Sequence, residues 1–267
     1  MLAGFRNRIV PGSVARRLSM RADSSYGPGM KLSEANITRS CPEREILNEL
    51  LELDGKHILE LGCGRAELTR LIATEGAGRS IAALEVDSIQ HGLNRKISDL
   101  PNVEFVMAGA EAIPYADASF DVAFMFKSLH HVPLELMDKA MAELHRVLKP
   151  GGLAYISEPV FAGAFNDILR LFHDEEQVRL AAFAAVKRAV ESGLFELASE
   201  TFFLAPMHFD DFADFEHKVL NVTHSDHRLS PELHEQVWAK FATHMTREGA
   251  NFVMPIRVDL LRKGTSG

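Results

Sequence analysis

Short apolar segments alternate with amphipathic segments from about residue 56 to residue 157, and this alternation constrains the fold more than any other feature. Short apolar runs indicate buried strands, whereas apolar residues every three or four positions indicate helices with one buried face. Strands and helices in alternation predict an α/β fold, a parallel sheet covered by helices on both faces. The predicted strands are Lys56–Leu61, Ile81–Val86, Val103–Val106, Phe120–Phe126 and Gly152–Ser157, and the predicted helices are Arg65–Thr74, Ile89–Leu100 and Leu134–Leu148.

The pattern differs on either side of this region. A helix is expected to begin near Ser40, because Ser40 and Glu43 have capping-box spacing and Pro42 suits a first helical turn. After Phe161 the pattern predicts two helices over 162–200, a strand over Phe202–Met207, helices over Asp210–Leu220 and Pro231–Met245, and a closing strand over Phe252–Leu261. The chain therefore divides into a basic N-terminal tail (1–39), an α/β core (40–160), a helical insertion after the fifth strand (161–200) and a C-terminal part of the core (201–267).

Composition excludes several classes of protein. The 267 residues are 46% hydrophobic and 25% charged, a globular balance, and the net charge of −8 disfavours a nucleic-acid partner. No apolar run approaches the length of a membrane span, which indicates a soluble, cytoplasmic protein. The alternative location is the mitochondrial matrix, because five arginines and no acid precede Asp23, as in transit peptides.

Two glycines follow the first predicted strand, Gly62 and Gly64. In an open parallel sheet the loops after the strands face the ligand, so these glycines are expected to line the site. A dinucleotide fingerprint needs a third glycine where this chain has Glu67, and no Gly-Lys-Ser/Thr follows as a triphosphate loop requires. Neither a dinucleotide nor a triphosphate is therefore the expected ligand.

Two acids beside the glycines indicate a different ligand. Glu60 ends the first strand, where a buried carboxylate would repel a pyrophosphate and attract an amino group. Glu85 ends the second strand, where an acid can accept hydrogen bonds from ribose hydroxyls. Together they predict a nucleoside that carries an amino acid.

Ordered motifs over residues 40–160 resemble those of the class I S-adenosylmethionine-dependent methyltransferases, especially the small-molecule group that includes the ubiquinone/menaquinone-type enzymes. Leu59–Gly64 is similar to the first motif of that family, and Glu85 matches its ribose-binding acid. Ala110–Tyr115 and Ser119–Val122 are similar to the adenine loop and the fourth strand of that family. Leu129–Val132 is similar to its segment after the fourth strand, and Val147–Gly152 to its turn into strand five.

The resemblance implies a doubly wound, mostly parallel, Rossmann-like sheet of seven strands with S-adenosylmethionine as the cofactor. Gly109 stands where the family often has an aspartate for the adenine amino group, so the Ala110 backbone, with Glu111 or water, would recognise adenine. The Lys127 backbone would meet the methionine part, and its side chain is expected in solvent. The cofactor-binding residues implied are Glu60, Gly62, Cys63, Gly64, Glu85, Val86, Ala110, Glu111 and Lys127.

The acceptor is expected beyond strands four and five, covered by the N-terminal segment as a lid and by residues 161–200 as a cap. His131 and Glu158 are the candidate catalytic residues there, with His131 the better base because histidine titrates near neutrality. Four phenylalanines could line the pocket: Phe161, Phe165, Phe172 and Phe183. We expect no metal, because the one His-x-x-His, His224–His227, lacks helical spacing and a clear third ligand.

The leading function is methyl transfer to a small molecule by in-line displacement. A nucleic-acid or protein methyltransferase is the second alternative. It is disfavoured by the acidic charge and by Lys127–His130, which stands where base-amino methylating families have Asn or Asp followed by Pro-Pro-aromatic. A non-catalytic binding or assembly subunit with a methyltransferase-like fold is the third.

Overall fold

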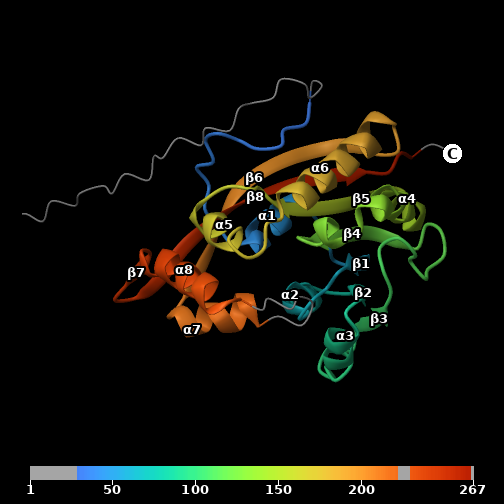
Figure 1. Cartoon of the computed structure of the whole chain (residues 1–267). Coiled ribbons are helices and arrows are strands. Elements are labelled where there is room, and N and C mark those ends of the chain that lie inside the picture. Colours follow the sequence, from blue (N-terminus) through green and yellow to red (C-terminus); the bar gives the residue numbers. More distant parts are fainter. Residues whose placement is uncertain (1–28, 222–228, 266–267) are drawn as a thin grey trace, which may run out of the picture.

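One twisted sheet organises the molecule, and its strands confirm the predicted α/β class (Figure 1). The computed structural model describes residues 29–221 and 229–265. The strand order is β3-β2-β1-β4-β5-β8-β6, and the short strand β7 pairs with β8. The first five strands are parallel, and β8 runs antiparallel to both of its long neighbours. The bounds are β1 His57–Leu61, β2 Ser80–Glu85, β3 Val103–Met107, β4 Phe120–Phe126, β5 Leu148–Pro159, β6 Glu196–Phe209, β7 Met245–Thr246 and β8 Gly249–Arg262.

Helices cover both faces of this sheet. Alternate strand residues point to opposite faces: Ile58 packs in one cluster with α1 (Glu43–Leu50) and α2 (Glu67–Thr74). Leu59 packs in a second cluster with α4 (Met137–Val147) and α6 (Glu176–Glu191). Helix α3 (Ser88–Asn94) follows β2. Glu60 has the same parity as Ile58, so its side chain lies on the face of the sheet that α1 and α2 cover. It is the one acid among the four buried residues of β1.

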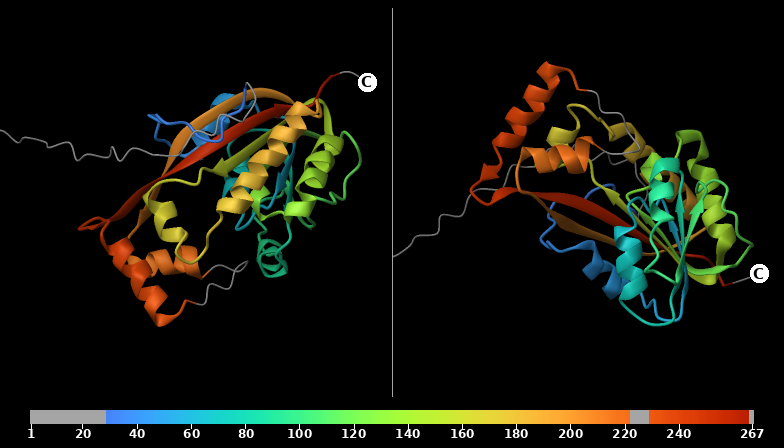
Figure 2. Two further views of the ribbon diagram at one scale, coloured as in Figure 1. Left: turned by 45° about the horizontal axis from the view of Figure 1, so that its top comes forward. Right: turned by 90° about the horizontal axis from the view of Figure 1, so that it is seen from below.

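A second helical group lies where β6 and β8 extend beyond β5 (Figure 2). It consists of α5 (Ala164–Leu169), α7 (Phe212–Phe215), a π-helical turn (Glu216–Leu220) and α8 (Pro231–Ala242). Phe209 of β6 and Phe252 of β8 are buried with these helices in a third apolar cluster, separate from the two clusters of the central sheet. These helices form a cap at one end of the sheet.

Several predicted boundaries are wrong. The first helix begins at Glu43 with Pro42 as its N-cap, and Ser40 pairs with Leu204 instead of capping the helix. Proline disfavours helical backbone at the residue before it, and the N–H of that residue, Cys41, donates to the Leu204 carbonyl at 3.2 Å. Strand β6 begins at Glu196, inside the segment predicted as helical, and α3 ends six residues before Leu100. The helices between β6 and β8 add to the cap that we expected from 161–200 alone.

Two features of the sequence analysis lie outside the described residues: the arginine-rich segment before Asp23 and the His224–His227 motif. Across the described ranges, no helix combines the length and apolar character that crossing a membrane requires.

Candidate functional site

Glycine occupies the two positions after β1, 62 and 64, for different structural reasons. Gly62 has φ +73°, and a Cβ added to it would lie 2.7 Å from Cβ of Ser128. Ser128 Oγ donates to the Leu61 carbonyl at 2.7 Å, so the loops after β1 and β4 touch at this point. Gly64 has φ +51°, but a Cβ there would meet nothing within 4 Å. Gly62 therefore permits loop packing, whereas Gly64 borders open space.

Glu85 is held in place by backbone donors. Its Oε2 accepts from the Gly64 N–H at 2.8 Å, and its Oε1 accepts from Val86 at 2.8 Å and Asp87 at 2.9 Å. Asn94 of α3 braces the same loop, because its Nδ2 donates to the Gly64 carbonyl at 2.7 Å. The carboxylate at the tip of β2 thus orders the loop after β1.

Glu60 is a buried carboxyl group beside this loop. Thr69 Oγ1 of α2 donates to its Oε2 at 2.7 Å, yet burial raises the pKa of Glu60 to about 7. Burial and the two nearby acids also raise the pKa of the Cys63 thiol, which keeps the thiol neutral. A cationic group beside Glu60 would compensate the buried charge, as expected for an amino group of a ligand.

In the loop after β3, the Glu111 side chain lies beside Gly109, the position at which the sequence lacks an aspartate. A Cβ on Gly109 would lie 2.3 Å from Glu111 Oε2, so the Glu111 carboxylate takes the space of that missing side chain. Three apolar side chains lie exposed near the ends of β2 and β3: Val86, Ile89 and Met107. Exposed apolar groups beside a carboxylate would suit a purine ring.

Lys127 follows β4 with φ +53°, an uncommon conformation for a side chain other than glycine. Its N–H donates to the Ser157 carbonyl at 2.7 Å, which fixes the turn against β5. Its Nζ pairs with the buried carboxylate of Glu43 in α1. The expected solvated side chain is therefore instead tied to the first helix.

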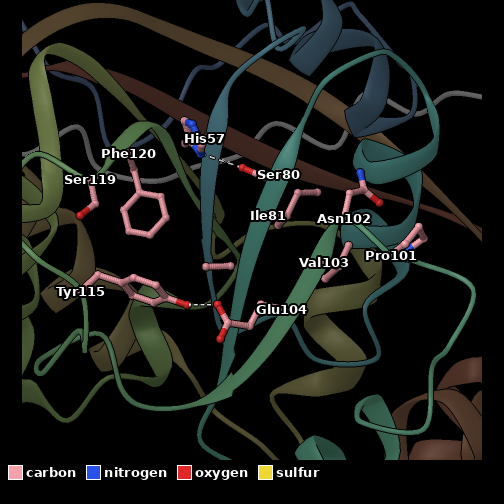
Figure 3. A pocket seen from close by; sticks show the side chains of 11 residues that line it. His57, Ser80, Ile81, Pro101, Asn102, Val103, Glu104, Tyr115, Ser119 and Phe120 are labelled. Carbon is pink, nitrogen blue, oxygen red and sulfur yellow. Dashed lines mark hydrogen bonds between the residues drawn. The ribbon is translucent and has the colours of Figure 1, made fainter.

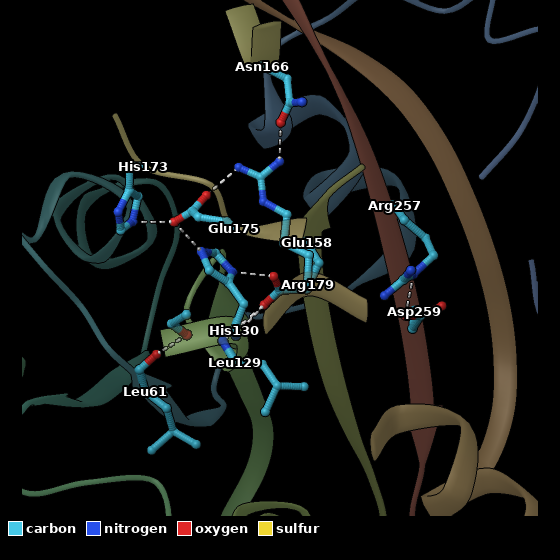
Figure 4. A network of polar contacts seen from close by, with 11 residues as sticks. Leu61, Leu129, His130, Glu158, Asn166, His173, Glu175, Arg179, Arg257 and Asp259 are labelled. Carbon is cyan, nitrogen blue, oxygen red and sulfur yellow. Dashed lines mark hydrogen bonds and ion pairs between the residues drawn. The ribbon is translucent and has the colours of Figure 1, made fainter. Parts of the chain in front are cut away.

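His130 and Glu158 form a buried pair, shown in Figure 4. Nδ1 of His130 contacts Oε2 of Glu158, and Oε1 of Glu158 accepts from the Leu129 N–H at 2.9 Å. Nε2 of His130 lies 3.6 Å from Oε1 of Glu175, which precedes α6. Burial alone lowers the pKa of His130, but the two carboxylates outweigh it and raise that pKa to about 9.

His131 is exposed, with its ring centroid 4.1 Å from that of His130. The structure thus separates the two candidate catalytic residues: Glu158 is turned inward to His130, and His131 lies at the surface. A narrow pocket opens at the end of β5 beside the pair, lined by Leu32, Glu158, Pro159, Val160, Phe161, Glu176, Arg179, Leu180 and Arg257.

The four phenylalanines expected at the acceptor differ in their roles. Phe161 lines this narrow pocket. Phe165 and Phe172 pack in the cap cluster, and Phe183 packs between α6 and the sheet.

A larger cavity, about 450 Å³, lies away from these residues (Figure 3). It is lined by His57 and Ser80, which begin β1 and β2, and by Phe120, which begins β4. The Tyr115 hydroxyl donates to Glu104 at 2.8 Å across its wall. This cavity is at the amino ends of the parallel strands, opposite the glycine loop, so it is not the expected cofactor site.

Comparison with known families places residues 59–156 in a family described as a methyltransferase domain. Sterol 4-C-methyltransferase strm-1 of Caenorhabditis elegans is 38% identical over 129 residues, covering 46% of this chain and 36% of that protein. O-methyltransferase rstn1 of Aspergillus nomiae is 34% identical over 143 residues, covering 51% and 61% respectively. The chain thus spans less than two thirds of the length of these relatives.

Solved structures share the fold. The YcgJ protein of Bacillus subtilis aligns with a TM-score of 0.59 at 15% identity, over 84% of this chain and 98% of that one. A structure described as a SAM-dependent methyltransferase of Methanosarcina mazei aligns with a TM-score of 0.52 at 17% identity, over 83% and 98%. At these identities the likeness shows the fold alone.

Proposed function

We propose that this chain, which by its domain and fold is a member of the class I S-adenosylmethionine-dependent methyltransferases, methylates a small molecule. The family generally uses S-adenosylmethionine, which supplies a methyl group already activated on a sulfonium. One observation carries the proposal: two carboxyl groups, Glu60 and Glu85, flank the loop that holds Gly64. Glu60 is buried and accepts from Thr69, Glu85 accepts from three backbone N–H groups, and the space beside Gly64 is open.

The residues fit each part of the cofactor. Glu60 would face the amino group, and Glu85 would accept from the ribose hydroxyls. The Gly64 backbone borders the space where a ligand can approach closely. Val86 would cover the adenine ring, with Ala110 and Glu111 at its edge. Cys63 and Lys127 would contribute backbone contacts, and Gly62 would hold the loop against Ser128.

The acceptor would enter from the narrow pocket at the end of β5. Leu32, Val160 and Phe161 make part of its lining apolar. Arg179 Nε and Arg257 Nη2 are buried nitrogen atoms that lack a hydrogen-bond partner among the described residues. An apolar acceptor that carries an oxygen function would satisfy both features, and residues 29–39 would cover it with the cap.

Glu158 and His131 would take different parts in the reaction. Glu158 would be a positioning residue, because it holds His130 and the turn after β4. His131 would be the imidazole on the acceptor side, acting on the acceptor's proton directly or through a bound metal ion. The protein otherwise contributes alignment, which accounts for much of the rate in a transfer between two oriented groups.

A labelled-methyl assay tests the function. The full chain is incubated with S-adenosylmethionine labelled in its methyl group and an extract separated into small-molecule, protein and nucleic-acid fractions. The proposal predicts label in the small-molecule fraction, abolished by heat denaturation of the chain. Label in protein or nucleic acid would support the second class of enzyme. Cofactor binding with no labelled product in any fraction would support a binding subunit.

A further inference from the structure

Three side chains that can ligate a metal gather where the turn after β4 meets the start of α6, and Figure 4 shows two of them, His130 and Glu175. Ligating atoms of His130, His131 and Glu175 lie within 4.8 Å of one another. His173 lies beside this group, with its Nε2 3.0 Å from Oε1 of Glu175. The group itself offers two imidazoles and one carboxylate from two segments that are about 40 residues apart in sequence.

The spacing matches that of a small coordination sphere. Tetrahedral zinc with bonds of about 2.0–2.1 Å separates neighbouring ligand atoms by roughly 3.3–3.5 Å. Oε1 of Glu175 lies 3.6 Å from Nε2 of His130, close to that separation. A ligating atom of His131 lies within 4.8 Å of both, so a shift of about 1 Å would complete the set.

The surroundings supply the supporting contacts that metal ligands need. A ligating histidine usually gives its other ring N–H to a carboxylate, which fixes its orientation. Nδ1 of His130 contacts Glu158, which leaves Nε2 directed toward Glu175. A metal ion at Nε2 would replace the proton that His130 holds toward Glu175, and that proton would be released to solvent. The second oxygen of Glu175 is held by Arg179, whose Nη1 donates to Asn166 at 3.0 Å. Both His130 and Glu175 are buried and thus held in place before a metal arrives.

We propose that His130, His131 and Glu175 bind one divalent first-row transition-metal ion, such as Zn²⁺, Co²⁺ or Mn²⁺, between the core and the cap. Three protein ligands leave one coordination position open. Imidazole and carboxylate ligands suit these ions. Resting on the proposed methyl transfer, the ion would hold an acceptor oxygen beside the end of β5 and favour its deprotonated form. The acceptor class would then be a hydroxyl or enol, consistent with a pocket that has unpaired guanidinium nitrogens.

The test measures metal binding itself. The full chain, without an affinity tag, is stripped with a chelator and titrated with Co²⁺, while visible d–d absorption and calorimetry report the site. Zn²⁺ is then added as a competitor, and elemental analysis of the dialysed protein gives the stoichiometry. The variants are His131→Ala, at an exposed position, and Glu175→Gln, which keeps the side-chain volume. Matched controls are His208→Ala, an exposed histidine 3.1 Å from Asp210, and Glu176→Gln, the adjacent acid.

We expect one Co²⁺ per chain, displaced by Zn²⁺, with affinity reduced at least about ten-fold in both ligand variants and unchanged in both controls. No Co²⁺ binding, or binding that both ligand variants retain while the circular dichroism spectrum is native, would overturn the site. A parallel titration with S-adenosylmethionine separates the two proposals. Cofactor binding without metal binding would refute only this inference, whereas metal binding without cofactor binding would refute the proposed function.

Discussion

The N–H of Gly64 donates to Oε2 of Glu85 at 2.8 Å, and this bond joins the loop after β1 to the tip of β2. Glu85→Ala removes the acceptor of Gly64 and also those of Val86 and Asp87. Leaving such donors unpaired costs roughly 1–3 kcal/mol, so we expect a loss of that size in the free energy of unfolding.

Urea unfolding of Glu85→Ala measures this loss, with Glu67→Ala as the control because Glu67 is exposed in the first turn of α2. Equal stability of wild type and Glu85→Ala would contradict an anchoring role for the carboxylate.

The two glycines should respond differently to alanine. Gly62→Ala brings a Cβ to 2.7 Å from Ser128 at a positive φ. Left-handed backbone costs about 1–2 kcal/mol and overpacking about 1–3 kcal/mol, so we expect a loss of roughly 2–5 kcal/mol. Gly64→Ala has room for the Cβ and should lose only about 1–2 kcal/mol from its backbone conformation.

Gly64→Ala, the variant with the smaller expected loss of stability, should weaken cofactor binding. Gly64→Ala places its methyl in the open space beside the loop, so we expect at least a ten-fold rise in the Kd for S-adenosylmethionine, about 1.4 kcal/mol. Calorimetry under conditions where both variants are folded measures this. Unchanged cofactor affinity in Gly64→Ala would argue that the ligand does not approach this backbone.

Glu60 should make stability depend on pH. Burial raises the pKa of Glu60 in the folded state to about 7, from an ordinary value of 4.5, so the folded state binds an extra proton between these two pH values. The contribution of Glu60 to the free energy of unfolding is therefore fully present below the pKa of Glu60 in the unfolded chain, and it is lost as the pH rises through 7. A shift of this size corresponds to up to about 3 kcal/mol.

Glu60→Gln removes this titration while keeping an acceptor for Thr69. We therefore expect the variant to gain stability relative to wild type as pH rises from 4.5 to 8, measured by urea unfolding at each pH. A saturating ligand with an amino group should reduce the difference. A constant difference across this range would show that Glu60 does not titrate there.

Glu111 should compensate for the glycine at 109. Glu111→Ala is expected to weaken S-adenosylmethionine binding about ten-fold, a loss of about 1.4 kcal/mol. Gly109→Asp alone should also perturb the loop, because the new Cβ falls 2.3 Å from Oε2 of Glu111. The double variant Gly109→Asp/Glu111→Ala should recover affinity. If the double variant bound S-adenosylmethionine no more tightly than Glu111→Ala, a shared role of positions 109 and 111 in cofactor binding would be excluded.

The sequence predicted the central sheet well because its signals are local. Strands β1, β2 and β4 are short, mostly apolar runs, and burial on both faces requires that composition. The boundaries failed where tertiary contacts decide. Ser40 has a good capping spacing, yet its pairing with Leu204 draws it to the edge of β6.

The site was predictable in its acids and glycines but not in its supporting partners. Glu60 and Glu85 lie at the carboxyl ends of β1 and β2, and Gly64 follows β1, so the pattern of strands locates all three. Glu175 carries no local signal, because it is brought to His130 by the return of α6 across the sheet. Thr69 and Asn94 are similarly ordinary helix residues whose contacts appear only in the folded chain.

A calorimetric titration tests the central claim most directly. S-adenosylmethionine, and separately NADH, is titrated into the full chain and into Glu85→Ala at a temperature where both are folded. We expect saturable binding of S-adenosylmethionine alone, weakened at least about ten-fold in the variant. No binding of S-adenosylmethionine by the folded wild-type chain, or equal binding by Glu85→Ala, would contradict a nucleoside site built on Gly64 and Glu85.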